Sequence, residues 1–266
     1  MPTLGRLRYL EARPEGRSRP DGTLLLLHAF PLSARMWDGQ LVLSETGWRV
    51  IAPHLRGMGG EHRDPPATSI DDYAADVIDL LDGLHVEDAV IGGLSMGGYV
   101  TFALFRLAPR YFRGMVLADT RPQADTPADR ESRQRMLSLV RDRGMPEVAD
   151  EVLPNLLAHE TIRARPDCVS LVRDLIEVNS VSAVDCALRA IMTRQDSTPV
   201  LTSIHCPTLI VVGEHDAITP PSVGRDMLRA VGGSELAVVP KAGHLSNLEQ
   251  PEAFNAALSR FLAHRV

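Results

Sequence analysis

The chain has 266 residues, of which 44% are hydrophobic and 23% are charged. This length fits one large α/β domain with an insertion, and the composition is typical of an ordinary globular protein. The formal net charge of −6 and the isoelectric point near 5.8 argue against nucleic acid or an anionic membrane as a partner.

The cysteines and the N-terminal residues indicate the compartment. Cys168, Cys186 and Cys206 are widely spaced and form no C-x-x-C pair, so they predict buried free thiols rather than a disulfide framework or a metal site. No stretch near Met1 has the apolar core of a signal peptide, and the longest apolar runs, such as 24–27, are too short to cross a bilayer. We therefore expect a cytoplasmic protein that needs neither a metal nor a cofactor.

Hydrophobic runs of strand length recur along the chain, and each is apolar almost throughout. They cover residues 23–27, 48–53, 89–91, 114–118, 208–213 and 235–240. Apolar residues at helical spacing predict helices between these runs, including 70–84, which has acidic residues near its start. Strands that are buried on both faces and alternate with helices predict a doubly wound, mostly parallel sheet. A weaker alternation over 4–10 predicts an edge strand, and 251–263 a closing helix.

The motif Gly93-Leu94-Ser95-Met96-Gly97 stands between the run 89–91 and a predicted helix that ends before Pro109. A serine at such a strand–turn–helix corner forms a nucleophile elbow, in which a strained turn exposes the hydroxyl above the sheet. The glycines two positions away on either side allow the strand and the helix to approach closely. We predict that Ser95 is a nucleophile and that the backbone N–H of Met96 faces a developing oxyanion.

Between residues 121 and 198 the strand pattern stops, and we predict about four helices. One covers 129–143, and the others begin near residues 146, 166 and 182, the last with Ser182 and Asp185 as a capping pair. A helical block between two strands of one sheet is an insertion, and we expect this one to cover an active site. The predicted division is a core of residues 1–120 and 199–266 and a helical cap of residues 121–198.

A serine becomes nucleophilic when a base takes its proton and a carboxylate orients that base. Asp216 follows the run 208–213 and His244 follows the run 235–240, at the strand ends where ligands bind in open α/β sheets. We predict His244 as the base and Asp216 as the acid. Asp119, which directly follows another strand, is the alternative acid. The second oxyanion donor is expected from the loop after 24–27, at the backbone N–H of Phe30.

Five motifs resemble those of the α/β-hydrolase superfamily, and they extend over nearly the whole chain. They are His28-Ala29-Phe30-Pro31, Arg56-Gly57-Met58-Gly59, Gly93 to Gly98, Gly213-Glu214-His215-Asp216, and the stretch from Gly243 to Pro251. The last motif looks most like that of the 3-oxoadipate enol-lactonases and their esterase relatives. Two positions depart from the pattern of the superfamily: Ala29 replaces the usual glycine, and His54 stands where an aspartate often precedes the Arg-Gly-x-Gly turn.

The resemblance and the predicted site together imply a serine hydrolase that cleaves a small carboxylic ester or lactone. Ser95 excludes the aspartate nucleophile of haloalkane dehalogenases and epoxide hydrolases. Cofactor-free perhydrolases, C–C hydrolases and ligand sensors of the same fold are the alternatives, and the oligomeric state is not predicted. Many arginines lie in the predicted cap, and one or two facing inward would suit a carboxylate-bearing substrate. They are Arg130, Arg133, Arg135, Arg163, Arg165, Arg173, Arg189 and Arg194.

Overall fold

The computed structural model describes residues 1–17, 19–60 and 67–266. Within these ranges, the centre of the fold is an eight-stranded sheet in the order β1-β2-β4-β3-β5-β6-β7-β8. The strands are β1 (Thr3–Leu4), β2 (Leu7–Ala12), β3 (Gly22–Leu27), β4 (Trp48–Pro53), β5 (Ala89–Leu94), β6 (Phe112–Ala118), β7 (Thr208–Gly213) and β8 (Glu235–Val239). Strands β3 to β8 pair in parallel, whereas β1 and β2 are antiparallel. The predicted doubly wound, mostly parallel sheet is confirmed.

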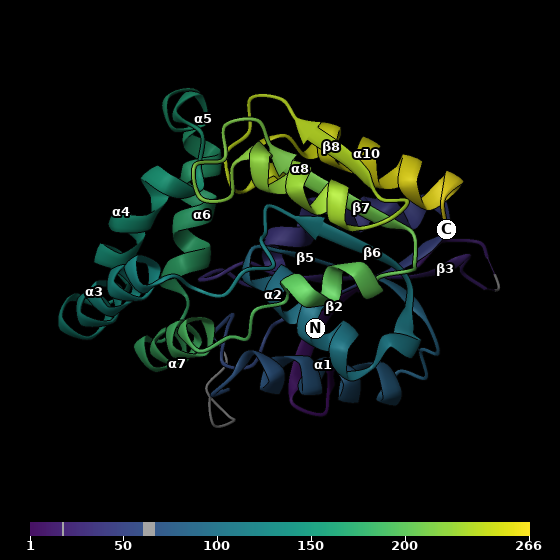
Figure 1. The fold of residues 1–266 in the computed structure, drawn as a ribbon, viewed down its shortest axis with the longest axis horizontal. Coiled ribbons are helices and arrows are strands. Elements are labelled where there is room, and N and C mark those ends of the chain that lie inside the picture. Colours follow the sequence, from purple (N-terminus) through teal and green to yellow (C-terminus); the bar gives the residue numbers. More distant parts are fainter. Residues whose placement is uncertain (18, 61–66) are drawn as a thin grey trace.

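Helices cover both faces of this sheet, as Figure 1 shows. Successive strand residues point to opposite faces, so Leu24 of β3 belongs to one buried core and Leu25 to the other. The first core is completed by η1 (Ala34–Thr46) and α10 (Pro251–His264), and the second by α1 (Ile70–Gly83), α2 (Met96–Leu107) and α8 (Pro221–Ala230). Burial on both faces explains why the strand sequences are apolar throughout.

Five α-helices are inserted between β6 and β7, ahead of the short 3₁₀ helix η3 (Thr198–Ser203), and they gather at one end of the sheet (Figure 1). They are α3 (Pro127–Arg143), α4 (Met145–Leu156), α5 (His159–Ala164), α6 (Pro166–Glu177) and α7 (Val181–Met192). The sequence predicted four, because α5 is too short to show a helical period. The capping residue of α7 is Ser180, whose hydroxyl accepts from the Ala183 N–H (3.2 Å), and not Ser182. Asp185 instead forms ion pairs with Arg141 and Arg189.

Two segments near the N-terminus differ from the prediction. The edge strand over 4–10 is divided into β1 and β2 by a turn at Gly5, which has φ 57°. The segment η1 is a 3₁₀ helix that the sequence did not reveal. Four of its five buried residues, Ala34, Trp37, Gln40 and Leu43, recur every three positions, as 3₁₀ geometry favours; Met36 is the fifth, and the polar Gln40 interrupts the hydrophobic pattern.

The three thiols are free, as predicted. The prediction that all three are buried is correct for Cys168 and wrong for Cys186 and Cys206, which are partly exposed. In the part of the chain that the structure describes, no helix is both long and apolar enough to span a membrane. The same residues contain no group of three or more histidine, cysteine, aspartate or glutamate side chains arranged to hold a metal ion.

Candidate active site

Ser95 lies at the turn between the end of β5 and the start of α2. Its φ of 56° and ψ of −114° place a non-glycine residue in a region of positive φ that such residues rarely adopt. The turn is held by the Ser95 N–H, which donates to the Ala118 carbonyl oxygen (3.0 Å). The Ser95 carbonyl oxygen in turn accepts from the Gly98 N–H (2.9 Å) and the Thr120 hydroxyl (2.8 Å). These contacts hold the strained conformation in place.

Backbone atoms approach closely on both sides of this turn. A Cβ atom added to Gly93 would lie 2.1 Å from the carbonyl carbon of Gly97. One added to Gly97 would lie 2.1 Å from the Leu27 carbonyl oxygen at the end of β3. Neither distance is compatible with any side chain, so the geometry requires glycine at both positions. The two glycines therefore allow a close backbone approach, as predicted. Gly97 makes this approach to the end of β3.

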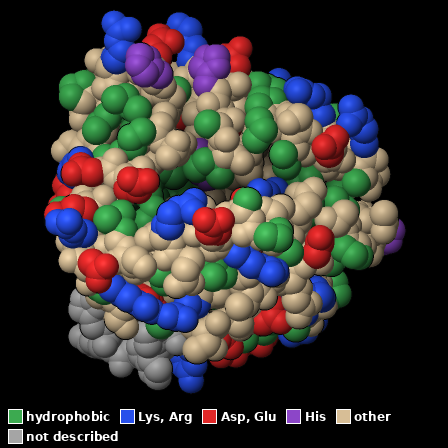
Figure 2. Space-filling model, turned by 60° about the vertical axis from the view of Figure 1, so that its left-hand side comes forward, with side chains coloured by type: hydrophobic (Ala, Val, Ile, Leu, Met, Phe, Trp, Pro, Cys, Tyr) green, Lys and Arg blue, Asp and Glu red, His purple; other side chains and the backbone are tan. Residues whose placement is uncertain are grey.

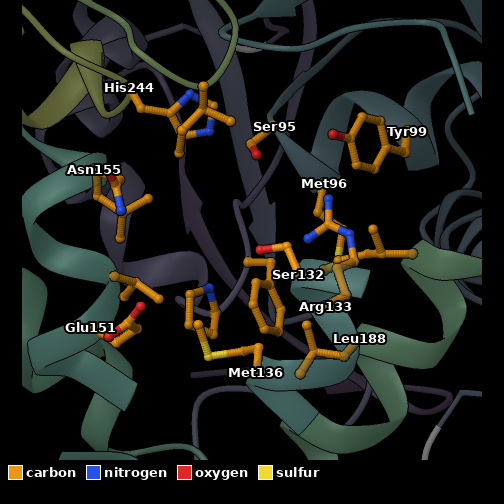
Figure 3. Close-up of a pocket in the computed structure, with 16 residues that line it drawn as sticks. Ser95, Met96, Tyr99, Ser132, Arg133, Met136, Glu151, Asn155, Leu188 and His244 are labelled. Atoms are coloured by element: carbon orange, nitrogen blue, oxygen red, sulfur yellow. The ribbon is translucent and has the colours of Figure 1, made fainter. Parts of the chain in front are cut away.

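Ser95 and His244 line the same cavity, which has a volume of about 250 Å³. In Figure 3, the Ser95 hydroxyl is directed into this cavity and the His244 imidazole lies beside it. Among the described residues, the Ser95 hydroxyl makes no hydrogen bond to the imidazole. Catalytic hydrogen bonds are often long before a substrate binds. The inserted helices α3, α4 and α7 contribute much of the remaining lining, and Phe30, Tyr99 and Ile218 are among the core residues that complete it. Figure 2 shows the corresponding hollow, which has hydrophobic side chains within and charged ones around it.

His244 is buried and bonded to Asp216. Its Nδ1 lies 2.8 Å from the Asp216 Oδ2 atom, which leaves Nε2 as the nitrogen available for proton transfer. Asp216 accepts three further hydrogen bonds, from the Ile218 N–H (2.8 Å), the Thr219 N–H (3.0 Å) and the Thr219 hydroxyl (2.6 Å). Thr219 was not identified from the sequence. It follows Asp216 by three residues, so the turn itself orients the carboxylate.

Opposite charges dominate the electrostatics of this pair. Burial disfavours the ionised form of Asp216, but the charge of His244 and the hydrogen bond to it outweigh burial and lower the pKa of Asp216 to about 2. Burial also opposes protonation of His244, yet the charge and hydrogen bond of Asp216, with smaller contributions from Asp119 and Glu249, raise the pKa of His244 above its ordinary value. The pair is therefore built to stabilise an imidazolium.

Asp119, the alternative acid, has different partners. Its Oδ1 accepts from the Gly213 N–H (2.7 Å) and its Oδ2 accepts from the Ser246 hydroxyl. No hydrogen bond joins it to His244 among the described residues. Burial, and then the charge of Asp216, raise the pKa of Asp119 well above the ordinary value of a carboxyl group. The geometry therefore favours Asp216 as the group that orients the imidazole.

The two predicted oxyanion donors are the backbone N–H groups of Phe30 and Met96, and both residues line the cavity together with Ser95. Neither backbone N–H donates to another described residue. The loop that carries Phe30 is held by His28, whose Nε2 accepts from the Leu55 N–H (2.9 Å) while Nδ1 lies 2.9 Å from the Ala29 carbonyl oxygen. Burial lowers the pKa of His28 to about 4, which keeps the ring neutral.

Asn179, in the short connection between α6 and α7, is a further residue that the sequence did not reveal. Its amide nitrogen donates to the Pro31 carbonyl oxygen (2.6 Å), next to Phe30, and its amide oxygen accepts from the Gly59 N–H (2.7 Å). It therefore joins the helical insertion to the loop of the predicted oxyanion donor. An asparagine in a polar stretch between two helices carries no sequence signal for this role.

The two departures from the superfamily pattern have structural counterparts. The Ala29 N–H donates to the Met36 sulfur (3.2 Å), so the loop accommodates a methyl group there. His54 is buried, and burial together with nearby positive charge and His28 lowers its pKa to about 3. Arg56 of the Arg-Gly-x-Gly turn pairs with Asp76 of α1 and not with residue 54. This pairing explains why the turn does not depend on an aspartate at position 54.

Of the eight arginines singled out in the insertion, Arg133 lines the cavity. Its Nε donates to Asp125 (2.5 Å), and Asp125 also pairs with Arg121 (3.1 Å) and Arg194 (2.5 Å). Arg194 in turn packs over the Tyr99 ring at 4.1 Å. The buried Asp125 carboxylate therefore contacts three guanidinium groups, which fixes the Arg133 side chain, and Arg121 also pairs with Asp129 (3.0 Å).

A strained serine turn on a doubly wound sheet, beside a buried histidine–aspartate pair, defines the α/β hydrolase class. The chain belongs to the α/β hydrolase family, whose model matches residues 24–257. It is 28% identical to 3-oxoadipate enol-lactonase 2 of Acinetobacter baylyi, over 88% of this chain and 86% of that protein. It is 27% identical to a protein of Mycobacterium tuberculosis named as a non-heme bromoperoxidase, over 82% and 84%.

Among solved structures, the chain is similar to a thermophilic esterase from Thermogutta terrifontis. The identity is 35% and the TM-score is 0.89, over 97% of this chain and 93% of the esterase. The relatives thus include hydrolases of esters and lactones as well as a protein with a peroxidase name, and they support a hydrolytic enzyme that acts on small molecules.

The glycine contact predicts that Gly93→Ala destabilises the protein, because the added methyl group meets backbone that cannot rotate away. We expect a loss of about 3 kcal/mol or more in the free energy of unfolding, measured by urea denaturation. Gly232→Ala is the matched control, since a Cβ there has no neighbour within 4 Å. If the two variants were equally stable, the elbow would tolerate a side chain at position 93, and the prediction would be wrong.

The neutral His28 predicts a pH dependence of stability. Its folded pKa is lowered to about 4 from 6.5, so the unfolded chain takes up a proton first as the pH falls, and stability is lost between these values. This group alone should cost about 2 kcal/mol between pH 7 and pH 5. In His28→Gln, urea denaturation should show a smaller loss, whereas a variant of the exposed His264 should behave like the wild type. An unchanged pH dependence in His28→Gln would contradict the assignment.

Proposed function

We propose that the protein is a serine hydrolase of small carboxylic esters or lactones, with Ser95 as nucleophile, His244 as base and Asp216 as acid. The observation that carries this proposal is the buried His244–Asp216 pair, joined over 2.8 Å, at the same cavity as the strained Ser95 turn. The enol-lactonase and esterase relatives support hydrolysis as the reaction.

In the proposed reaction, the Ser95 Oγ attacks the carbonyl carbon while its proton moves to the His244 Nε2 atom. The backbone N–H groups of Met96 and Phe30 donate to the resulting oxyanion. Loss of one such donor typically costs about 3 kcal/mol in the barrier. His244 then returns the proton to the leaving oxygen, the bond from carbon to that oxygen breaks, and an acyl-serine remains. A water molecule then attacks this ester and gives a proton to His244, which passes a proton to the Ser95 Oγ atom as the bond from carbon to Oγ breaks and the acid leaves.

We propose further that residues 121–198 act as a cap over a core of residues 1–120 and 199–266. The supporting observation is that α3, α4 and α7 contribute side chains to the cavity that Ser95 and His244 line. The volume of about 250 Å³ is below the range of about 300–1,000 Å³ that is usual for drug-sized ligands. The cap therefore suits a small substrate and would exclude a long acyl chain.

Arg133 supports a carboxylate on the preferred substrate. It projects from α3 into the cavity, while Glu151 projects from α4 (Figure 3). The bond to Asp125 holds the guanidinium in place and leaves other N–H groups free to pair with a carboxylate. An acidic lactone, of the kind named in the enol-lactonase relative, would satisfy both the small volume and this charge.

A perhydrolase is the second candidate function, because one relative is named as a non-heme bromoperoxidase. The same acyl-serine would form, and hydrogen peroxide instead of water would attack it and release a peracid. The two reactions are distinguished by the product formed from one ester in the presence and absence of peroxide. Faster acyl transfer to peroxide than to water at equal concentration would favour the second function.

Ser95→Ala should abolish covalent labelling by a fluorophosphonate and nearly all turnover of p-nitrophenyl acetate, because Ser95 carries the only hydroxyl of the motif Gly93-Leu94-Ser95-Met96-Gly97. The far-ultraviolet circular dichroism should remain that of the wild type. The removal of one hydroxyl at a half-buried position leaves the backbone hydrogen bonds of the turn intact. Full labelling of the variant would assign the nucleophile to a different residue and end the proposal.

Asp216→Asn should lower kcat by a factor on the order of 10⁴, because the amide no longer stabilises the imidazolium that forms during attack. Asp119→Asn should lower it much less, since Asp119 contacts Gly213 and Ser246 instead of the imidazole. Steady-state kinetics on one small ester measures both variants. If Asp119→Asn were the more damaging change, the acid role would pass to Asp119.

Substrate preference follows from the cavity. In a p-nitrophenyl ester series, kcat/KM should be highest for short acyl chains and low for chains beyond about eight carbons. A maximum at long chains would contradict the small cavity.

Arg133→Gln should lower kcat/KM for a carboxylated lactone by about 10- to 100-fold, which is the contribution of a charge-assisted hydrogen bond, and leave kcat/KM for its methyl ester nearly unaffected. Arg163→Gln removes the same charge at an exposed position and serves as the control. Equal effects of Arg133→Gln on the carboxylated lactone and on its methyl ester would contradict the carboxylate contact.

A further inference from the structure

Glu249 is a buried carboxylate that the proposed reaction does not use. It ends the short helix α9 (Ser246–Glu249), and its exposed fraction is 1%. Its Oε1 atom accepts from the Gly243 N–H (2.7 Å), directly before His244. Its Oε2 atom accepts from the Ala158 N–H (2.8 Å) and the Thr161 hydroxyl (2.6 Å), both in the helical insertion.

All of these partners donate, so the two oxygens of an ionised carboxylate satisfy them together. Burial raises the pKa of Glu249, while the hydrogen bonds from Thr161, Ala158 and Gly243 act in the opposite direction. The backbone of the same residue is also held, because its carbonyl oxygen accepts from Arg165 (3.1 Å). Glu249 is therefore a fixed point between the insertion and the loop of His244.

The His244 loop has further contacts on both sides of the histidine. The N–H groups of His244 and Leu245 both donate to the Leu156 carbonyl oxygen (3.1 Å each), and Leu156 lines the cavity. On the opposite side, the Ser246 hydroxyl donates to Asp119. The end of α4 therefore helps to set the position of the imidazole, and Glu249 is a buried charged group that joins the insertion to this loop.

We propose that Glu249 is a positioning residue for the reaction: it fixes the His244 loop to the helical insertion through Gly243, so that the imidazole stays aligned between Ser95 and Asp216. This proposal rests on the proposed function only in that His244 is the base. A misplacement of a catalytic group by about 1 Å can cost on the order of 100-fold in rate, so a small shift of this loop would be visible in kcat.

Glu249→Gln is the informative change, because it keeps the shape of the side chain. A carboxylate accepts at both oxygens, whereas a carboxamide has one acceptor and one N–H₂ group. In either orientation, the N–H₂ group faces a backbone N–H, that of Gly243 or that of Ala158. Thr161→Val is the matched control, because it removes one donor to Glu249 and leaves the Gly243 contact in place.

The test combines kinetics with a readout that does not need turnover. For a small ester, Glu249→Gln should lower kcat per fluorophosphonate-titrated site by about 10- to 100-fold, with KM changed much less. Asp216, Asp119 and Glu249 all act to raise the pKa of His244, so loss of the Glu249 carboxylate should also lower the pKa of His244 in an NMR titration of its imidazole. Thr161→Val should stay near the wild type in both measurements.

Three results would overturn the proposal. The first is an unchanged kcat per titrated site in Glu249→Gln. The second is an imidazole titration identical to that of the wild type, and the third is an equal loss in Thr161→Val. A wild-type protein that neither turns over esters nor reacts with the fluorophosphonate would contradict the proposed function instead. The NMR comparison of Glu249→Gln with Thr161→Val would still show whether the loss of the Glu249 carboxylate reaches the His244 imidazole.

Discussion

The close backbone approach at the end of β5 is the constraint on which the site depends. Gly93 and Gly97 let α2 begin directly against β3, and this places Ser95 at a φ of 56°. A similar contact recurs at the acid and the base, where a Cβ on Gly213 would lie 1.9 Å from the Gly243 carbonyl oxygen. The turn of Ser95 and the pair of loops that carry Asp216 and His244 thus each depend on a close contact of glycine backbone, and neither contact leaves room for a side chain.

Burial acts on two histidines of the site with opposite outcomes. His28 has no carboxylate partner among the residues that the structure describes, so burial lowers its pKa to about 4 and the neutral ring serves as a hydrogen-bonding link between two loops. His244 is equally buried but faces Asp216, and its pKa is raised. The neighbouring carboxylates therefore determine which histidine is suited to carry a proton and which to hold backbone.

The sequence predicted the sheet, and it placed Ser95, His244, Met96 and Phe30 at what is one cavity in the structure, because each follows a strand whose apolar run is easy to recognise. It did not reveal Asn179, whose partners Pro31 and Gly59 are distant in the chain. Contacts of this kind depend on tertiary packing and leave no periodicity. The segment η1 was missed for a different reason, since most of its buried residues recur every three positions instead of at the spacing of an α-helix, and one of them is a glutamine.

The role of the inserted helices follows from their polar links to the loops around the cavity. Glu249 joins them to the loop of His244, and Asn179 joins them to the loop of Phe30. Arg133 is held by Asp125 within the same helical layer. In this account, the insertion contributes both to the selection of the substrate and to the alignment of the base.

The most direct test of the central claim, that the His244–Asp216 pair activates Ser95, is the pH dependence of the rate at which a fluorophosphonate reacts with Ser95. The reactive form of the base is the neutral imidazole, so the rate should rise with pH through a pKa above the ordinary 6.5 of histidine. His244→Gln should slow the reaction and remove this dependence. A rate in His244→Gln that follows the same pH profile as the wild type would contradict the account.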